Sequence, residues 1–482
     1  MAKFYITSAI PYVNAQPHIG HALEFVQADA IARYHQVLGD DVLYLCGSDE
    51  NAMKNVQAAE KEGVPIQDFV NKNTKLFIAL AERLNVHFGV FQQGSDAQHY
   101  AASQKLWTLC KANGDIYKKE YSGLYCVGCE TFYTRDELNE NGECFEHPGR
   151  KLEEVTEENY FFKLSAYQEK LTELIESDTI AIVPTYRKNE ILAFLKRGLN
   201  DISISRSNER AKNWGVPVPD DSQQRMYVWF DALNIYQSGI GFGVNEDLYK
   251  KWWPADVQVI GKGIIRFHAV YWPAFLLSAK LALPKKLFVH EYITVNGQKM
   301  SKTLGNVIDP NMLIEKYGAD SLRYFFLRYI SPFADGDFSE NTFVEKYNAD
   351  LANGLGNLTA RVAKLCETES FEQLGSKDRS SIHLMDVAQY DQAMRDYKFF
   401  DALNFVWTKI ASLDKFIGEE RPWEMAKKGD ARLKSVLSHA VDQIQEIAVL
   451  LEPFMPDTAK RIEKQFAGPK VNSEKPLFPR IQ

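Results

Sequence analysis

Two short clusters of basic residues, far apart in the chain, indicate chemistry on phosphate groups. His18 and His21 flank Ile19-Gly20 in the segment HIGH, at the turn into a stretch with helical spacing. A helix N-terminus presents unpaired N–H groups and a positive dipole end, which attract phosphate. Two imidazoles on one turn can donate hydrogen bonds to the same triphosphate, and Gly20 allows a flat base to approach closely. Four residues alone leave open that these are ordinary surface histidines.

The second cluster is the segment KMSKT, which contains Lys299, Ser301 and Lys302. It follows Asn296-Gly297, and a turn at this dipeptide predicts a mobile loop. Two lysines separated by two small or flexible residues can bind a leaving pyrophosphate as point charges. A solvated basic loop is the alternative for the lysines alone. The pairing of HIGH with KMSKT is much rarer than either segment and favours a nucleotide triphosphate site.

Four potential metal ligands form a third pattern. Cys126-x2-Cys129 and Cys144-x2-His147 are two ligand pairs joined by a polar segment. Three thiolates and one imidazole complete tetrahedral zinc coordination and leave no position for water, so we predict a structural zinc knuckle. The polar segment could not build a core unaided, so metal ligation would supply its folding free energy. Chance spacing of free cysteines is the alternative.

The elements that must position the HIGH segment form a βαβ unit. Residues 3–10, KFYITSAI, are rich in β-branched and aromatic side chains and predict a strand, and residues 21–39 have apolar side chains at helical spacing. Residues 41–50 predict a second strand that ends in Asp49 and Glu50. Two strands joined by a crossover helix imply a parallel sheet, with ligands at the carboxyl ends of its strands. Dinucleotide binding is poorly supported, because no GxGxxG follows the first strand.

Composition limits the class of protein. The chain has 482 residues, enough for about three domains of roughly 150 residues. Hydrophobic residues make up 45% and charged residues 25%, which is typical of a folded soluble protein. The net charge of −8 argues against indiscriminate nucleic-acid binding but permits a local basic groove. The first residues lack the layout of a signal peptide, and no window of about 18 uncharged apolar residues occurs. The few cysteines suit a reducing compartment. We therefore expect a cytoplasmic protein without membrane contact.

The two basic signatures resemble HIGH and KMSKS of the class I aminoacyl-tRNA synthetases. The surrounding segments are similar to those of the methionyl-tRNA synthetases: AIPYVNAQPHIGHALE, CGSDENA, YVWFDALNIY, IGKGIIRFHAVYWPA and HEYITVNGQKMSKTLGN. The likeness extends through NGLGNLTARV and RPWEMAK and so covers essentially the whole chain. The resemblance implies a Rossmann-like (HUP-type) parallel-sheet catalytic domain with a zinc-knuckle connective insertion, followed by an all-α anticodon-binding bundle.

Composition changes over residues 117–225 and the pattern is helical after about residue 348, and the resemblance then implies five segments. Residues 1–116 form the first half of the catalytic α/β domain, 117–225 the connective insertion, 226–292 the second half of the α/β domain, 293–347 the KMSKS and stem-contact region, and 348–482 the helical anticodon-binding domain. The insertion is too short for the editing domain of the valyl, leucyl and isoleucyl enzymes. A further tRNA-binding or dimerising barrel has no room after the bundle, so we expect a monomer.

The implied activity is ATP-dependent attachment of methionine to tRNA(Met), initiator tRNA included, through methionyl-adenylate with release of AMP and pyrophosphate. The catalytic residues would be His18, His21, Lys299 and Lys302, and the ATP site would add Gly20, Gly261 and Ser301. The implied cofactors are Mg²⁺ with ATP and one structural zinc ion on Cys126, Cys129, Cys144 and His147.

The resemblance also implies a methionine pocket and an anticodon site. The pocket would comprise Ile10, Tyr12, Asp49, Trp229, Ala232, Tyr236, Ile264, His268 and Trp272, with Asp49 on the ammonium group and aromatic rings around the thioether. The anticodon site would comprise Asn357, Arg361, Pro422 and Trp423, which offer base-edge hydrogen bonds and a stacking plane. Without the resemblance, ordinary core packing would explain Trp229, Ile264, Trp272 and Trp423.

Three motifs depart from the family pattern. Asn51-Ala52 stands where His-Gly is usual, Gly263 replaces a carboxylate expected on the ATP ribose, and Thr303 replaces serine. The Gly263 change would weaken ATP binding unless another acid substitutes. Two rival classes are an adenylate-forming nucleotidyltransferase that uses no tRNA, and a catalytically weak RNA-binding relative.

Overall fold

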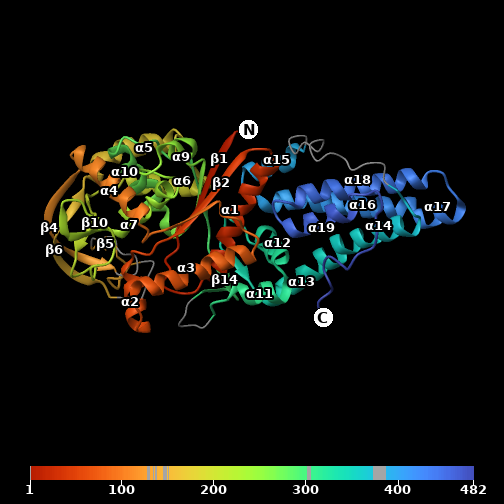
Figure 1. Ribbon diagram of the computed structural model, residues 1–482, viewed down its shortest axis with the longest axis horizontal. Coiled ribbons are helices and arrows are strands. Elements are labelled where there is room, and N and C mark those ends of the chain that lie inside the picture. The colour runs from red at the N-terminus through yellow and green to blue at the C-terminus, as the bar shows by residue number, and fades with distance from the viewer. Residues whose placement is uncertain are drawn as a thin grey trace.

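A six-stranded parallel sheet forms the centre of the larger domain (Figure 1). The computed structural model describes residues 2–126, 131–133, 135, 138–144, 149, 151–300, 306–372 and 387–482. The strand order is β3 (Val90–Gln93), β2 (Asp41–Ser48), β1 (Lys3–Ser8), β12 (Val257–Gly261), β13 (Lys286–His290) and β7 (Ala181–Val183). β1 therefore pairs with a strand some 250 residues later, with Thr7 opposite Gln258.

The crossover from β1 to β2 runs through α1 (Ile19–Val37), as the helical spacing predicts. Its apolar side chains, including Leu23, Val26 and Ala30, are buried against the sheet and the neighbouring helices. Gly39 follows the helix with a φ of +86°, a left-handed conformation that glycine adopts without strain. Helices α2 (Met53–Glu62), α3 (Ile66–Arg83) and α4 (Ala97–Ala112) complete this half of the domain.

The insertion is built on two small antiparallel sheets at the end of the molecule farthest from the bundle (Figure 1). One sheet has the order β5 (Thr131–Tyr133), β4 (Ile116–Cys126), β6 (Glu153–Phe162) and β8 (Ile202–Ser203), and the other β10 (Pro217–Val218), β11 (Asp221–Met226) and β9 (Ser205–Ser207). Helices α5 (Gln168–Glu176) and α6 (Thr185–Leu195) flank β7, which leaves the insertion and extends the parallel sheet along β13.

Short helices return the chain from the insertion to the parallel sheet. They are α7 (Val228–Ala232), α8 (Ile235–Ser238) and α9 (Glu246–Trp252), and α10 (Trp272–Ser278) then connects β12 to β13. A three-stranded sheet of β15 (Gln298–Lys299), β14 (Ile293–Val295) and β16 (Gly336–Phe338) then precedes the bundle, together with α11 (Pro310–Tyr317), α12 (Ala319–Tyr329) and α13 (Glu340–Lys346).

The remaining described residues form a bundle of long amphipathic helices, α14 (Asn357–Thr368), α15 (Ala388–Arg395), α16 (Phe399–Glu420), α17 (Pro422–Lys428), α18 (Leu433–Leu451) and α19 (Pro456–Phe466). α17 lies at the tip of the bundle (Figure 1). The predicted parallel-sheet α/β domain and helical C-terminal region are confirmed. Within the ranges that the structure describes, no helix combines the length and the apolar run needed to cross a membrane.

Candidate active site and tRNA-binding residues

The HIGH segment forms the first turn of α1, just beyond the carboxyl end of β1. His18 is the N-cap residue, and its Nδ1 accepts a hydrogen bond from the Gly20 amide at 3.1 Å. In the reciprocal hydrogen bond, His21 Nδ1 accepts from the His18 amide at 3.1 Å. The two rings stack with centroids 3.9 Å apart. Two imidazoles therefore cap the helix that the sequence predicts to receive phosphate.

These caps fix which ring nitrogen can donate. Each Nδ1 accepts a backbone N–H, so the ring proton of His18 and of His21 lies on Nε2. Burial, together with the nearby His18, lowers the pKa of His21 well below its ordinary value of 6.5. His21 is therefore a neutral hydrogen-bond donor at pH 7, suited to a developing phosphate charge without itself titrating.

Two residues of the KMSKT region lie against the HIGH turn, Met300 between the two lysines and Ile308 after them. The Cε atom of Met300 lies 3.7 Å from the position that a Cβ on Gly20 would occupy. On the other side, the carbonyl of Ile308 accepts from the Ile19 amide at 3.2 Å. Lys299 is the last residue of β15, and the structure describes its backbone but not its side chain. Ser301 and Lys302 lie outside the described residues. The two signatures nevertheless converge, although nearly 280 residues separate them.

The carboxyl end of β12 lies beside the same helix, and that helix carries an acid, Glu24, that the sequence pattern did not reveal. Gly261 pairs in register with His290, whose Nε2 lies 2.8 Å from Glu24 Oε2 on α1. Burial would lower the pKa of His290, but the hydrogen bond and charge of Glu24 outweigh it and raise that pKa. One feature of the sequence could have indicated Glu24: it follows Gly20 by four residues, so the two share one face of the helix.

Gly263 itself lies in a short 3₁₀ turn after β12 (Lys262–Ile264). Its neighbour Lys262 forms ion pairs with Glu291 at 2.8 Å and Asp335 at 2.6 Å. Several charged groups therefore surround the position of the missing carboxylate, and Glu24 is the acid on the helix of the HIGH turn.

Tyr12, Asp49 and Trp229 come together on one side of the predicted methionine pocket. Tyr12 and Asp49 pair as a parallel bridge, supported by the hydrogen bond from the Asp49 amide to the Pro11 carbonyl at 2.9 Å. The Trp229 ring meets the Tyr12 ring edge-on, with centroids 6.3 Å apart. Asp49 is only 3% exposed, so its carboxylate is largely removed from water, where its attraction for an ammonium group is stronger.

Phe267 is a neighbour of the predicted pocket residue Trp229 that the sequence analysis missed. It stacks on Trp229 with centroids 3.7 Å apart and an interplanar angle of 6°. Its place directly before His268 in the motif was the available signal, because adjacent residues on a tight helical turn can both border one cavity.

Tyr236 and His268 form a neutral hydrogen-bonded pair. His268 Nδ1 donates to the Ile264 carbonyl at 3.0 Å, so its Nε2 accepts from the Tyr236 hydroxyl at 2.8 Å. Burial lowers the pKa of His268 to about 4 and raises that of Tyr236 well above 10.0. Uncharged polar groups of this kind fit a thioether side chain better than charged ones would.

The other predicted pocket residues differ in exposure. Ala232 and Trp272 are buried, whereas Ile10 and Ile264 are partly exposed. Trp272 is 0% exposed and meets Trp253 edge-on at 6.1 Å, which also fits the core-packing alternative.

Two of the four predicted zinc ligands are neighbours. The Cys126 and Cys144 sulfur atoms lie 3.3 Å apart, both side chains are buried, and neither forms a disulfide. Two thiols this close fit adjacent positions around one tetrahedral ion. Cys129 and His147 lie outside the described residues, and among those that are described no group of three or more potential ligands could hold a metal ion.

The predicted anticodon residues lie on α14 and α17 of the bundle. Asn357 is exposed at the start of α14, and Arg361, one turn later, forms an ion pair with Asp414 of α16. Pro422 is buried as the first residue of α17, and Trp423 is 39% exposed beside it. The exposed part of its ring is accessible for stacking.

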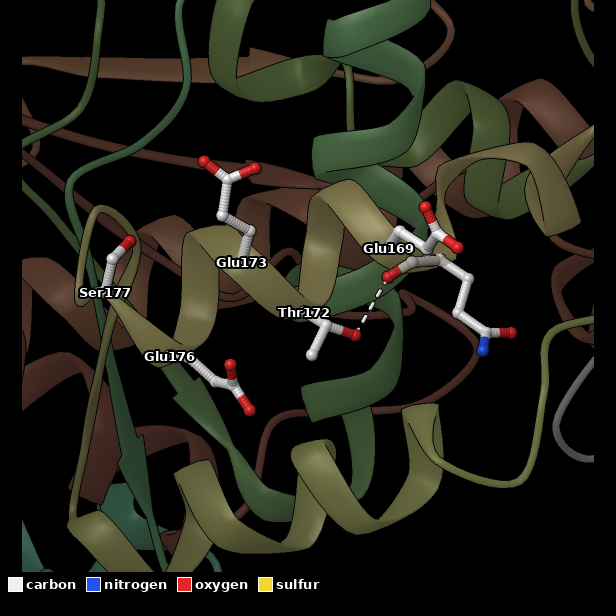
Figure 2. A pocket seen from close by; sticks show the side chains of 6 residues that line it. Glu169, Thr172, Glu173, Glu176 and Ser177 are labelled. Carbon is white, nitrogen blue, oxygen red and sulfur yellow. Dashed lines mark hydrogen bonds between the residues drawn. The ribbon is translucent and has the colours of Figure 1, made fainter.

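A shallow hollow of about 460 Å³ on α5 is not part of this site (Figure 2). Its lining includes Glu169, Glu173 and Glu176, together with Gln168, Thr172 and Ser177. Three carboxylates on one helix would repel ATP and RNA phosphates.

Comparison with known proteins identifies the family. The family model for tRNA synthetases class I (M) matches residues 4–363. The methionine–tRNA ligase of Brucella suis biovar 1 is 40% identical over 507 aligned positions, covering 99% of this chain and 98% of that protein. The methionine–tRNA ligase of Thermotoga maritima is 41% identical and covers 95% of this chain and 74% of that protein. The resemblance inferred from the motifs is confirmed.

Solved structures show the same fold throughout. The Mycobacterium tuberculosis methionyl-tRNA synthetase in complex with methionyl-adenylate has a TM-score of 0.91 at 36% identity and covers 100% of both chains. Its apo form has a TM-score of 0.85 at 33% identity, covering 100% of this chain and 99% of that chain.

Proposed function

This chain belongs to the class I tRNA synthetases (M), and we propose that it attaches methionine to tRNA(Met), initiator tRNA included, through a methionyl-adenylate intermediate. The proposal is supported by the closeness of Met300 and Ile308 to the HIGH turn, and by the meeting of Tyr12 with Trp229 and with the buried Asp49. ATP and methionine would therefore meet at the carboxyl ends of β1 and β12.

In the first step, the methionine carboxylate attacks the α-phosphate of ATP and pyrophosphate leaves. Little covalent chemistry is required of the protein, so catalysis rests on positioning and on stabilising charge that grows on the phosphates. His18 and His21 would donate from Nε2, while Lys299, Ser301 and Lys302 would hold the leaving pyrophosphate. Mg²⁺ bound with ATP would neutralise part of the phosphate charge.

Glu24 is the carboxylate that we propose for the ATP ribose in place of the side chain missing at Gly263. It shares a helix face with Gly20, where the base would approach, and reaches His290 opposite Gly261. A carboxylate accepts hydrogen bonds from two neighbouring hydroxyls, which is the chemistry that a ribose requires.

Methionine would bind with its ammonium group on Asp49 and its thioether among Tyr12, Trp229 and Phe267. Each sulfur–aromatic contact contributes roughly 0.3–1.5 kcal/mol. Size alone separates side chains that differ by one methylene by about 1–3 kcal/mol, so contacts to sulfur add selectivity against leucine.

In the second step, a ribose hydroxyl of the terminal tRNA adenosine takes the methionyl group from the adenylate and AMP leaves. Asn357, Arg361, Pro422 and Trp423 would read the CAU anticodon at the bundle. Arg361 must then exchange its ion pair with Asp414 for contacts with RNA.

One zinc ion would be held by Cys126, Cys129, Cys144 and His147. The closeness of two of the thiols supports this, and the ion's role would be to stabilise the fold of the insertion. We also propose a monomer that acts in the cytoplasm, where tRNA is charged; sedimentation at micromolar concentration would test the oligomeric state.

The deciding experiment is methionine-dependent exchange of pyrophosphate into ATP, followed by charging of initiator and elongator tRNA(Met). Exchange and charging together are expected. Exchange without charging would favour the adenylate-forming enzyme that uses no tRNA. RNA binding without exchange would favour the catalytically weak relative.

A further inference from the structure

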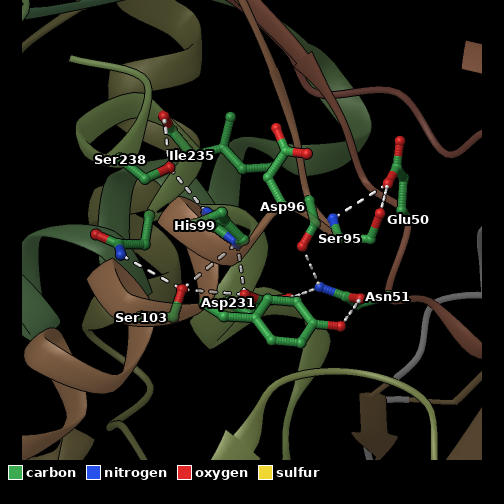
Figure 3. A network of polar contacts seen from close by, with 12 residues as sticks. Glu50, Asn51, Ser95, Asp96, His99, Ser103, Asp231, Ile235 and Ser238 are labelled. Atoms are coloured by element: carbon green, nitrogen blue, oxygen red, sulfur yellow. Dashed lines mark hydrogen bonds and ion pairs between the residues drawn. The ribbon is translucent and has the colours of Figure 1, made fainter. Parts of the chain in front are cut away.

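A buried polar network includes Asn51, His99, Ser103 and Asp231 (Figure 3). At its centre is Asp231 of α7, which is 2% exposed. Its Oδ2 accepts from the Asn51 side chain at 2.6 Å, and its Oδ1 accepts from His99 Nε2 at 2.6 Å and from Ser103 Oγ at 3.1 Å. A buried carboxylate is tolerated only with such partners, so each donor matters to its position.

The network connects the two sides of the pocket. Asn51 follows Asp49, the proposed ammonium ligand, by two residues. Asp231 follows Trp229 by two residues within the same short helix, α7. The Asn51–Asp231 hydrogen bond therefore ties the segment that carries the carboxylate to the helix that carries the aromatic ring.

Asn51 is well suited to this connection. One N–H of its amide donates to Asp231, and the other donates to the Gly94 carbonyl at 2.8 Å. Its Oδ1 accepts from the Tyr100 hydroxyl at 3.3 Å. A neutral imidazole, which the family pattern has here, offers only one N–H, whereas the asparagine amide supplies two donors independently of pH.

The neighbouring departure, Ala52, introduces no strain. Ala52 precedes α2 with φ −69° and ψ 142°, an extended conformation that alanine adopts readily, and its side chain is buried. The Asn51-Ala52 pair is therefore compatible with a well-formed pocket.

We propose that Asn51 is a positioning residue for methionine, acting through Asp231 and His99 to hold Asp49 and Trp229 at the separation that the substrate requires. This inference rests on the proposed function. It predicts that substitution of Asn51 weakens methionine binding and leaves ATP binding and the rate of the phosphoryl step unchanged.

The experiment measures pyrophosphate exchange with Asn51→Ala while methionine and ATP are varied separately. Loss of a hydrogen bond to a buried charge should raise KM for methionine at least about tenfold. The KM for ATP and kcat should stay within about twofold. Asn113→Ala is the matched control, because Asn113 also donates to an aspartate, Asp115 at 2.8 Å, but is exposed and lies in another part of the domain.

A reversal of the pair provides the second test. Asn51→Asp places two carboxylates against each other, and Asp231→Asn removes the charge that His99 and Ser103 bind. The double variant Asn51→Asp/Asp231→Asn restores one donor and one acceptor across the same contact. Its KM for methionine should lie at least threefold below that of Asn51→Asp.

Three outcomes would overturn the proposal. They are an unchanged KM for methionine in Asn51→Ala, an equal change in kcat and both KM values, and a double variant no better than Asn51→Asp. Wild-type protein without any methionine-dependent exchange would instead contradict the proposed function.

Discussion

Asp29 of α1 and Arg323 of α12 form a buried ion pair, with 2.7 Å between Oδ2 and Nη2 and side-chain exposures of 3% and 0%. Arg323 also donates to the carbonyls of Phe454 at 2.8 Å and Pro453 at 3.0 Å, in the turn between α18 and α19. One guanidinium therefore joins the helix that begins at the HIGH turn to the helical bundle. The proposed catalytic and anticodon-reading parts of the molecule meet at a rigid, charged contact.

Removal of this guanidinium should destabilise the whole protein. Arg33 also pairs with Asp29 at 2.7 Å, so Arg323→Met leaves the buried carboxylate one guanidinium partner and removes the donor to the carbonyls of Pro453 and Phe454. We expect a loss of about 3 kcal/mol in the free energy of unfolding, measured with denaturant. The double variant Asp29→Leu/Arg323→Met should lose less, because the buried carboxylate is gone and the side chain of Arg33, which is 16% exposed, can reach water. A single variant within about 1 kcal/mol of wild type would contradict this account.

Lys302→Ala should slow adenylate formation far more than it weakens methionine binding. Loss of one preorganised contact to the phosphates typically costs about 2.7–4 kcal/mol, or on the order of a hundredfold or more in rate. Pyrophosphate exchange gives the rate, and methionine titration gives the affinity, which should change less than about twofold. Lys170→Ala on α5 is the control, since that lysine is exposed and pairs only with Glu173 among the described carboxylates. Exchange at the wild-type rate would remove Lys302 from the proposed mechanism.

The Glu24–His290 pair should make stability depend on pH. The folded pKa of His290 is raised above its ordinary value of 6.5, so the folded state holds the proton more tightly. This contribution is fully present below pH 6.5 and is lost as the pH rises through the folded pKa, with a slope of at most about 1.4 kcal/mol per pH unit. In Glu24→Gln the hydrogen bond to the Glu291 carbonyl and the Glu291 charge still oppose burial, so the folded pKa of His290 should fall and the stability gained below pH 6.5 should shrink. Unfolding of both proteins between pH 5 and 9 tests the loss of this pH dependence.

The same variant separates the structural role of Glu24 from its proposed role in substrate binding. Glu24→Gln should raise KM for ATP roughly tenfold, because an amide binds ribose hydroxyls less strongly than a carboxylate. KM for methionine should change less than twofold. His290→Gln is the control, since it removes the ion pair but keeps the carboxylate. If both variants changed KM for ATP equally, Glu24 would act only through the ion pair.

Local patterns predicted the parts of this molecule that depend on neighbours in sequence. The strand–helix–strand unit of residues 3–50 and the helices of the bundle follow from periodicity, and the HIGH turn from its position before α1. Long-range pairings could not be predicted in this way. β7 extends the parallel sheet from within residues 117–225, and Phe267 stacks on Trp229 across the pocket. Both depend on tertiary packing, which a single sequence does not encode in any local spacing.

Zinc removal should unfold the insertion and leave the bundle intact. Cys144→Ser replaces a buried thiol that lies 3.3 Å from the Cys126 sulfur, so zinc should fall from one equivalent per chain to well below half. Metal analysis after dialysis gives the zinc content, and limited proteolysis should detect new cleavage between residues 117 and 160. Cys366→Ser, at a buried cysteine of α14, is the control and should retain zinc. Full zinc occupancy in Cys144→Ser would contradict the ligand set.

Trp423→Ala should impair tRNA charging without affecting adenylate formation. Stacking of one base on an aromatic ring is worth roughly 1–3 kcal/mol, so kcat/KM for tRNA(Met) should fall about 5–150-fold. Pyrophosphate exchange should stay at the wild-type rate, because the ring lies on α17 at the tip of the bundle, away from the HIGH turn (Figure 1). Trp423→Phe keeps an aromatic plane, so its kcat/KM for tRNA(Met) should stay close to that of the wild type. If the alanine and phenylalanine variants charged tRNA equally well, the exposed ring would not be a stacking platform for the anticodon.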